Sequence, residues 1–186
     1  MRPAERGRGV RGRRARLPRR PLPRRQLNVA VISDTHMPRG TRRLPDECAR
    51  LLGEADLILH AGDFVSPAVY EALRGFAPVQ GVAGNMDEAE LRALLPPRLV
   101  VEIEGLRIGM VHDAGPALGR AERLIEAFPG CAAVIYGHTH VPDAVRLGGA
   151  WVLNPGSPTE RRSAPNHGMI VLDVLKGGLD VRTYVL

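Results

Sequence analysis

The segment LNVAVISDTH at residues 27–36 decides how this chain folds. Residues 27–33 are mostly apolar and rich in β-branched side chains, a pattern that predicts a short buried strand. Asp34 and His36 follow at once, so two good metal ligands stand directly after the strand. In open α/β sheets, ligands bind beyond the carboxyl ends of the strands. The segment therefore predicts an α/β fold and also the edge of the sheet where its functional site lies.

The same arrangement recurs four more times along the chain. Short apolar runs at 56–60, 78–82, 106–111 and 132–136 lead to Gly62-Asp63, Gly84-Asn85, His112 and Gly137-His138-Thr139-His140. Glycine before the ligand lets the backbone turn sharply beside the site. Helices are predicted over 44–54, from Ser66 as N-cap with Pro67 in the first turn, over 91–95 and over 117–128. Hairpins are predicted for 99–103 with 106–111, 143–147 with 150–153, and 168–175 with 179–185.

Seven side chains at these strand ends are good metal ligands: Asp34, His36, Asp63, Asn85, His112, His138 and His140. They bring carboxylate, amide and imidazole groups without thiolate, a mixture that suits Mn²⁺, Fe²⁺ or Zn²⁺. Seven ligands are too many for one tetrahedral ion, but they suit two ions if one carboxylate bridges. Two ions about 3.5–4 Å apart can clamp a phosphate and activate a water molecule. The set therefore points to hydrolysis of a phosphate ester.

Composition separates the N-terminal segment from the rest of the chain. The length of 186 residues favours one domain, and we place it at 27–186. Residues 1–25 hold eleven arginines and a single acidic residue, so residues 26–186 carry −4 of the total charge of +6. The basic segment 1–26 is also rich in Pro and Gly, which predicts disorder. It is interpretable as a nucleic-acid-binding arm, as a targeting peptide or as an extension without a role, and its lack of aromatic residues weakens the first interpretation.

The remaining composition indicates a cytoplasmic protein. No run approaches the roughly 18 apolar residues of a membrane span, and no apolar segment follows the basic N-terminus as in a secretory signal. Cys48 and Cys131 are far apart in sequence, and we expect two buried thiols rather than a disulfide.

At these motifs the chain resembles the calcineurin-like metallophosphoesterases, and in particular the small bacterial and archaeal phosphodiesterase group that includes the retromer subunit of this fold. The resemblance covers about residues 27–186 and includes the turn Asn154-Pro155-Gly156-Ser157. It implies a four-layer αββα sandwich in which two mixed sheets are flanked by helices. It also implies two divalent ions, with Mn²⁺ expected and Fe²⁺, Zn²⁺ or Ni²⁺ as alternatives.

The resemblance further implies how the ligands divide and what they do. Asp34, His36 and His140 would hold one ion, Asn85, His112 and His138 the other, and Asp63 would bridge them. A hydroxide between the ions would then attack a phosphodiester, with monoesters as a second substrate class. The implied partner is a small phosphate ester or a nucleotide. Nucleic acid bound by the basic segment and a homo-oligomer remain open, and no membrane is implied.

Two departures from the family pattern concern the chemistry. Many members carry a histidine after the Gly-Asn pair that protonates the leaving group, and here this residue is Met86. The general acid is therefore unassigned, with Asp87, Asp113 and His60 as candidates. Asp113 also replaces a glycine that usually follows His112, and its charge would either tighten metal binding or repel an anionic substrate.

Substrate contacts are less strongly indicated than metal ligands. Asn85 is one candidate, and Arg161 or Arg162 could reach a substrate phosphate from the loop after residue 157. His60 could instead orient a ligand or be an ordinary core histidine. Two functions from different classes remain: a metal-dependent phosphoesterase, or a non-catalytic interaction module that keeps the fold, as the retromer subunit does.

Overall fold

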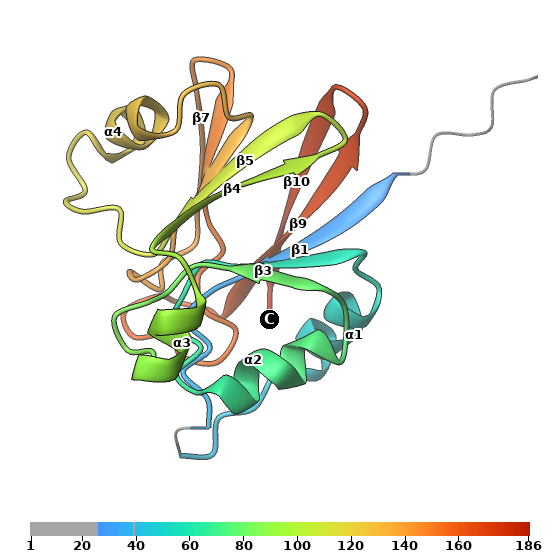
Figure 1. Ribbon diagram of the computed structural model, residues 1–186, viewed down its shortest axis with the longest axis vertical. Helices are drawn as coiled ribbons and strands as arrows, with labels where there is room; N and C mark the ends of the chain where they lie inside the picture. The colour runs from blue at the N-terminus through green and yellow to red at the C-terminus, as the bar shows by residue number, and fades with distance from the viewer. Residues whose placement is uncertain (1–25, 39) are drawn as a thin grey trace, which may run out of the picture.

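The computed structural model describes residues 26–38 and 40–186. The predicted disordered segment 1–26 lies, apart from Gln26, outside the described residues. The described chain forms two five-stranded mixed sheets (Figure 1). The first sheet has the order β10-β9-β1-β2-β3, and it consists of β1 (Leu27–Ile32), β2 (Leu57–His60), β3 (Val79–Gly81), β9 (Gly168–Leu175) and β10 (Gly178–Val185). Strands β1, β2 and β3 are parallel, and β9 and β10 join antiparallel.

The second sheet repeats this plan with a parallel centre. Its order is β4-β5-β6-β8-β7, and its strands are β4 (Arg98–Ile103), β5 (Leu106–Val111), β6 (Ala133–Ile135), β7 (Asp143–Leu147) and β8 (Ala150–Asn154). Strands β5, β6 and β8 run parallel, while β4 and β7 are antiparallel edge strands joined by hairpins. Glu104 and Gly105 make the turn between β4 and β5, and both have positive φ, as a two-residue hairpin requires.

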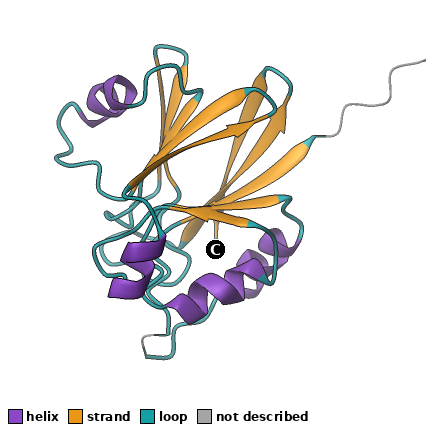
Figure 2. Cartoon of the chain, in the orientation of Figure 1, coloured by secondary structure: helices purple, strands orange, loops and turns teal. Residues whose placement is uncertain are grey.

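Three apolar layers hold these sheets and helices together. Helices α1 (Asp46–Gly53), α2 (Pro67–Arg74) and α3 (Ala89–Leu94) contribute buried residues to a core with the outer face of the first sheet. Residues of both sheets share a second core between them, including Val31, Ile108 and Leu172. Helix α4 (Arg120–Ala127) covers the outer face of the second sheet through Leu124, with Phe128 beside it. The predicted αββα sandwich is therefore confirmed (Figure 2).

The predicted elements agree with the observed ones to within a few residues at their ends. Ser66 stands before α2 as expected, but its hydroxyl makes no capping hydrogen bond. The reason is that the N–H of Val69 donates to the backbone carbonyl of Ser66 instead. Cys48 and Cys131 are buried free thiols, as predicted. Among the described residues, no helix has the length and apolar character that a membrane span needs.

Candidate metal centre

The five strands that precede the ligands end along one edge of the sandwich. Parallel strands β1, β2 and β3 bring their carboxyl ends to one edge of the first sheet, and parallel β5 and β6 do the same in the second. Figure 2 shows loops crowded where the two sheets end. The loops after these strands interlock, since the N–H of Asp34 donates to Gly62 at 2.9 Å and that of Gly137 donates to His112 at 3.0 Å. The topology thus gathers the seven predicted ligands.

Three of them form a first buried cluster. The Nε2 atoms of His36 and His140 are 3.3 Å apart, and Asp34 Oδ1 is 3.3 Å from the His140 nitrogen and 3.9 Å from that of His36. All three side chains are buried. Atoms that share an ion at about 2.1 Å from each are separated by about 3–4 Å, so these donors fit a single ion.

The other nitrogen and amide donors form a second cluster. Asn85 Oδ1 lies 3.0 Å from His112 Nε2 and 3.0 Å from His138 Nδ1. His112 is buried, whereas His138 is partly open to solvent. The second cluster therefore forms the more exposed side of the centre.

One carboxylate oxygen lies between the clusters. Asp63 Oδ2 is 3.5 Å from His36 Nε2 and 3.4 Å from His112 Nε2. The other oxygen, Oδ1, accepts a hydrogen bond of 2.7 Å from the backbone N–H of Met86. Because that bond orients the carboxylate, Oδ2 is the atom directed at both clusters. A bridge between two ions would be made through this single oxygen.

Two backbone carbonyls orient the imidazoles. His112 Nδ1–H donates to the carbonyl of Ala61 at 2.8 Å, and His140 Nδ1–H donates to that of Glu160 at 2.6 Å. Each bond places the proton on Nδ1 and leaves the Nε2 lone pair directed at the cluster. Histidines that bind metals are commonly held by such an outer hydrogen bond.

The surroundings of Asp34, Asp63 and His36 favour their ligating protonation states, whereas at His112 burial is outweighed by the hydrogen bond with Asp63, which raises the pKa of His112, so an ion would have to displace a proton there. Burial opposes ionisation of Asp34, but its hydrogen bond with His140 and the nearby His112 outweigh burial and lower the pKa of Asp34. Asp63 is likewise buried, yet its interaction with His112 lowers its pKa. Burial lowers the pKa of His36, despite the charge of Asp63 beside it. The carboxylates are therefore ionised and His36 is neutral, as metal binding requires.

The backbone at the ligands is unusual. Five of the seven ligands have positive φ: Asp34, His36, Asp63, His138 and His140, with values between 44° and 68°. Residues other than glycine rarely adopt this region, and each such residue costs about 1–3 kcal/mol. Such strain clusters at functional sites, because the surrounding structure must impose it for a reason other than stability.

The glycines at these strand ends pack against ligands. A Cβ at Gly62 would lie 2.7 Å from the ring of His112, and one at Gly137 would lie 2.8 Å from Asp34 Oδ2. A Cβ at Gly84 would overlap Asp63. Gly62 also has a φ of +92°, whereas Gly84 and Gly137 do not have positive φ. Close approach, rather than a sharp turn, is therefore what positions 84 and 137 require.

His60 connects two ligand loops from within the core. The buried ring accepts a hydrogen bond of 3.1 Å from the N–H of Gly62 at Nδ1, so that Nε2–H donates to the Thr35 hydroxyl at 3.2 Å. Burial lowers the pKa of His60 to about 3. The ring also stacks on Phe64 with centroids 3.5 Å apart. Both nitrogens are thus occupied, and His60 braces the loops that carry Asp34 and Asp63.

The two acidic candidates for proton transfer lie in different surroundings. Asp87 is buried, and its two oxygens accept hydrogen bonds from the N–H groups of Val65, at 2.8 Å, and Gly84, at 2.7 Å. Burial raises its pKa. Asp113 is exposed and accepts a bond of 2.8 Å from the N–H of Gly115. Asp87 therefore shapes the turn before Asn85, whereas Asp113 shapes the loop after His112.

The predicted substrate arginines are bound to backbone carbonyls. Arg161 donates to Pro165 at 2.7 Å, within its own loop, and Arg162 donates to His138 at 3.3 Å. Sequence reasoning missed Glu160 and Arg42. Glu160 Oε2 lies 3.7 Å from His36 Nε2, and Glu160 Oε1 pairs with Arg42 at 2.8 Å. Only their adjacency to Arg161 and to the Asp34 loop could have suggested either residue.

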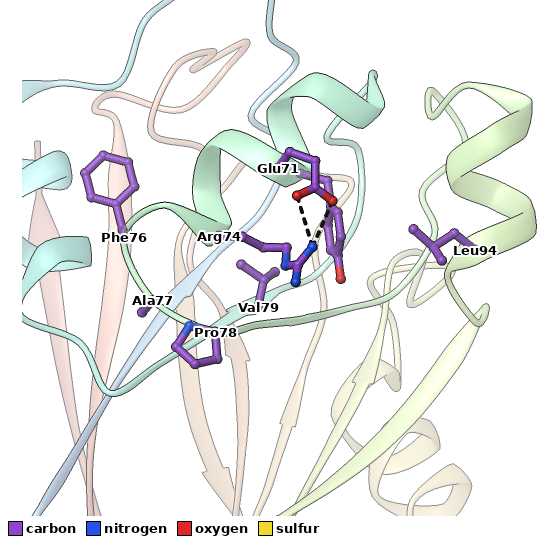
Figure 3. Close-up of a pocket in the computed structure, with 8 residues that line it drawn as sticks. Glu71, Arg74, Phe76, Ala77, Pro78, Val79 and Leu94 are labelled. Atoms are coloured by element: carbon purple, nitrogen blue, oxygen red, sulfur yellow. Dashed lines mark hydrogen bonds and ion pairs between the residues drawn. The ribbon is translucent and has the colours of Figure 1, made fainter.

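A groove adjoins the second cluster. It has a volume of about 310 Å³ and is lined by Asn85 and His112 together with Ala83, Pro97, Arg98, Val111 and Asp113. A larger cavity lies elsewhere, between the end of α2, β3 and α3 (Figure 3). Its lining includes Arg74, which pairs with Glu71, and contains none of the seven ligands. The groove beside Asn85, although smaller, is therefore the one placed for chemistry.

Comparison with known proteins points to one family. The family model described as the calcineurin-like phosphoesterase superfamily domain matches residues 27–177. A probable metallophosphoesterase of Methanothermobacter thermautotrophicus is 38% identical over 136 residues, which cover 72% of this chain and 78% of that protein.

Two solved structures share the fold at lower identity. A structure described as a novel archaeal phosphodiesterase has a TM-score of 0.68 at 20% identity and covers 86% of this chain and 100% of its own. Vps29 from Entamoeba histolytica, described as complexed with zinc, has a TM-score of 0.66 at 22% identity and covers 86% of this chain and 99% of its own. At these identities the two structures show a common fold.

Proposed function

The chain belongs to the calcineurin-like phosphoesterase superfamily, and we propose that it is a hydrolase of phosphodiesters that depends on two metal ions. The observation that carries the proposal is the position of Asp63 Oδ2, 3.5 Å from His36 Nε2 and 3.4 Å from His112 Nε2. One oxygen between two sets of donors is what a dinuclear site requires. When bound, two ions would polarise the phosphoryl oxygens and lower the pKa of a water molecule.

The predicted ligands and Met86 have different proposed roles. The buried donors Asp34, His36 and His140 make one half of the centre, and the more exposed Asn85 and His138 make the other half, beside the groove that would hold the organic groups of the ester. Met86 holds Asp63 through its backbone, while its side chain can carry no proton. The leaving oxygen must therefore depart with little assistance from an acid, which favours esters of acidic alcohols.

The groove supports a diester over a monoester. A diester carries a second organic group on phosphorus, and Ala83, Pro97 and Val111 offer apolar walls beside Asn85 for such a group. The similarity to the archaeal phosphodiesterase points in the same direction. We propose Mn²⁺ as the ion, because carboxylate and amide oxygens stand beside imidazoles in the donor set.

The alternative is an interaction module with the same fold. Similarity to Vps29 supports this alternative. Met86 in place of an acid would also suit a protein that hydrolyses no substrate. A single experiment separates the two functions. Protein stripped with EDTA is loaded with Mn²⁺, its metal content is measured, and hydrolysis of bis(p-nitrophenyl) phosphate is compared with that of p-nitrophenyl phosphate.

We expect two ions per chain and faster turnover of the diester, and Asp63→Ala serves as the inactive control. Diester turnover no greater than that of Asp63→Ala would contradict an enzymatic role. Equal turnover of both esters would contradict the preference for diesters alone.

A further inference from the structure

An ion pair lies beside the first cluster, outside the seven ligands. Arg42 and Glu160 are joined at 2.8 Å, and their side chains are 29% and 25% exposed. The second carboxylate oxygen, Glu160 Oε2, lies 3.7 Å from His36 Nε2. The ion pair therefore lies between the solvent and His36 Nε2, the atom that faces the first cluster.

The position of Glu160 follows from the turn at residues 154–157. The N–H of Glu160 donates to Ser157 Oγ at 2.9 Å, and its carbonyl accepts a bond of 2.6 Å from His140 Nδ1–H. The Ser157 hydroxyl in turn donates to the carbonyl of Asp34 at 2.7 Å. Since the N–H and the carbonyl of Glu160 are both tied to ligand loops, its backbone is held on the rim of the centre, and its side chain extends from there toward His36 and Arg42.

We propose that Arg42 binds a non-bridging oxygen of the substrate phosphate, and that the Glu160 carboxylate occupies the place of this phosphate in the free protein. The inference rests on the proposed function. Glu160 presents one anionic oxygen to a predicted metal ligand and the other to a guanidinium, as a phosphate ester bound at this centre would. Arginine suits the role, because its planar fork matches two oxygens of one phosphate.

The other arginines near the centre have different partners, and Arg98 of the groove lies over the ring of Phe128, 5.8 Å from its centroid. Arg162 donates to the carbonyl of His138, and Arg161 to that of Pro165. Arg123 donates to carbonyls of the loop after Asp113, including Leu118. Among the described residues, Arg42 is thus the arginine paired with a side chain that reaches the first cluster. A substrate phosphate that displaces the Glu160 carboxylate would pair with Arg42 in its place.

The test measures binding of inorganic phosphate to the protein loaded with Mn²⁺, by calorimetry, so that it needs no turnover. Arg42→Ala should weaken phosphate binding by about tenfold or more, the effect of losing one charge-assisted hydrogen bond. Arg43→Ala is the matched control, because Arg43 is an exposed neighbour on the same loop. Its phosphate affinity should equal that of the wild type. Both variants should keep two Mn²⁺ ions.

Glu160→Gln tests the second half of the proposal. The variant loses the competing charge but keeps an oxygen for Arg42, so it should bind phosphate at least as tightly as the wild type. Loss of affinity equal to that of Arg42→Ala would overturn the idea that Glu160 stands in for phosphate. Equal phosphate affinity in Arg42→Ala and Arg43→Ala would overturn the role of Arg42. Failure of the wild type to bind Mn²⁺ would instead overturn the proposed function.

Discussion

Gly84 lies directly against the side chain of Asp63. A Cβ at Gly84 would overlap both the carboxylate and the backbone nitrogen of Asp63, although the φ of Gly84 is one that any residue can adopt. Asp63 Oδ2 is the atom between the two clusters, so the absence of a side chain at position 84 is a condition for the bridge.

Gly84→Ala is therefore expected to lose both Mn²⁺ ions and to unfold at lower temperature. Overpacking at a buried contact costs about 1–3 kcal/mol. Gly53→Ala is the matched control, because its Cβ would meet Phe76 at an ordinary 4.0 Å. Elemental analysis and thermal unfolding measure the two effects. Two ions retained in Gly84→Ala would show that Asp63 does not bridge from this position.

Substitutions of single ligands should show which residues hold which ion. Asp63→Ala should lose both, since one oxygen faces both clusters. His36→Ala should lose the ion of the first cluster, because His36 Nε2 lies beside His140. Asn85→Ala should lose the ion of the second cluster, because Asn85 Oδ1 lies beside His112. Metal content after gel filtration measures the result. Asp113→Ala should keep two ions, as its exposed carboxylate bonds to its own loop. Two ions retained in Asp63→Ala would refute the bridge.

Met86 leads to a prediction about leaving groups. Aryl esters should be cleaved much faster than alkyl esters, because no acid at position 86 protonates the departing oxygen. General acid catalysis contributes about 10²–10⁴-fold, so Met86→His should recover part of this factor for alkyl esters and change aryl esters little. The measurement is the dependence of kcat/KM on the pKa of the leaving alcohol. A flat dependence in the wild type, with chemistry rate-limiting, would mean that another group already donates the proton.

His60 leads to a prediction about pH in metal-free protein. Its pKa falls to about 3 on burial, against 6.5 in the unfolded chain. The unfolded state therefore binds more protons between these values, so this contribution to stability is complete above pH 6.5 and is lost as the pH falls. From pH 7.5 to pH 5 the loss is about 2 kcal/mol.

His60→Gln should escape this part of the loss, because glutamine does not titrate. Urea unfolding in EDTA at both pH values measures it for the variant and the wild type. The same decrease in both proteins would contradict a neutral, buried His60 as the source.

The fold class and the types of ligand could be predicted from the sequence. Strand-forming runs such as residues 27–33 carry their own periodicity, and each ends in ligands whose chemistry is a property of the residue type. Parallel strands place their carboxyl ends at one edge, so the gathering of Asp34, Asp63 and Asn85, which follow three strands of one sheet, could be predicted from the order of elements. The αββα layers followed from the family resemblance that these motifs carry.

The residues that surround the predicted ligands could not be predicted from the sequence, because they come from separate loops. Glu160 and His36 are far apart along the chain. No local sequence pattern predicts that Glu160 Oε2 lies 3.7 Å from His36 Nε2. The positive φ of His138 and the close approach of Gly84 to Asp63, from the loops after two neighbouring strands, are likewise features of the folded chain. Such features depend on side chains packed from separate loops, and a sequence pattern encodes the geometry of a single segment, not the distance between two.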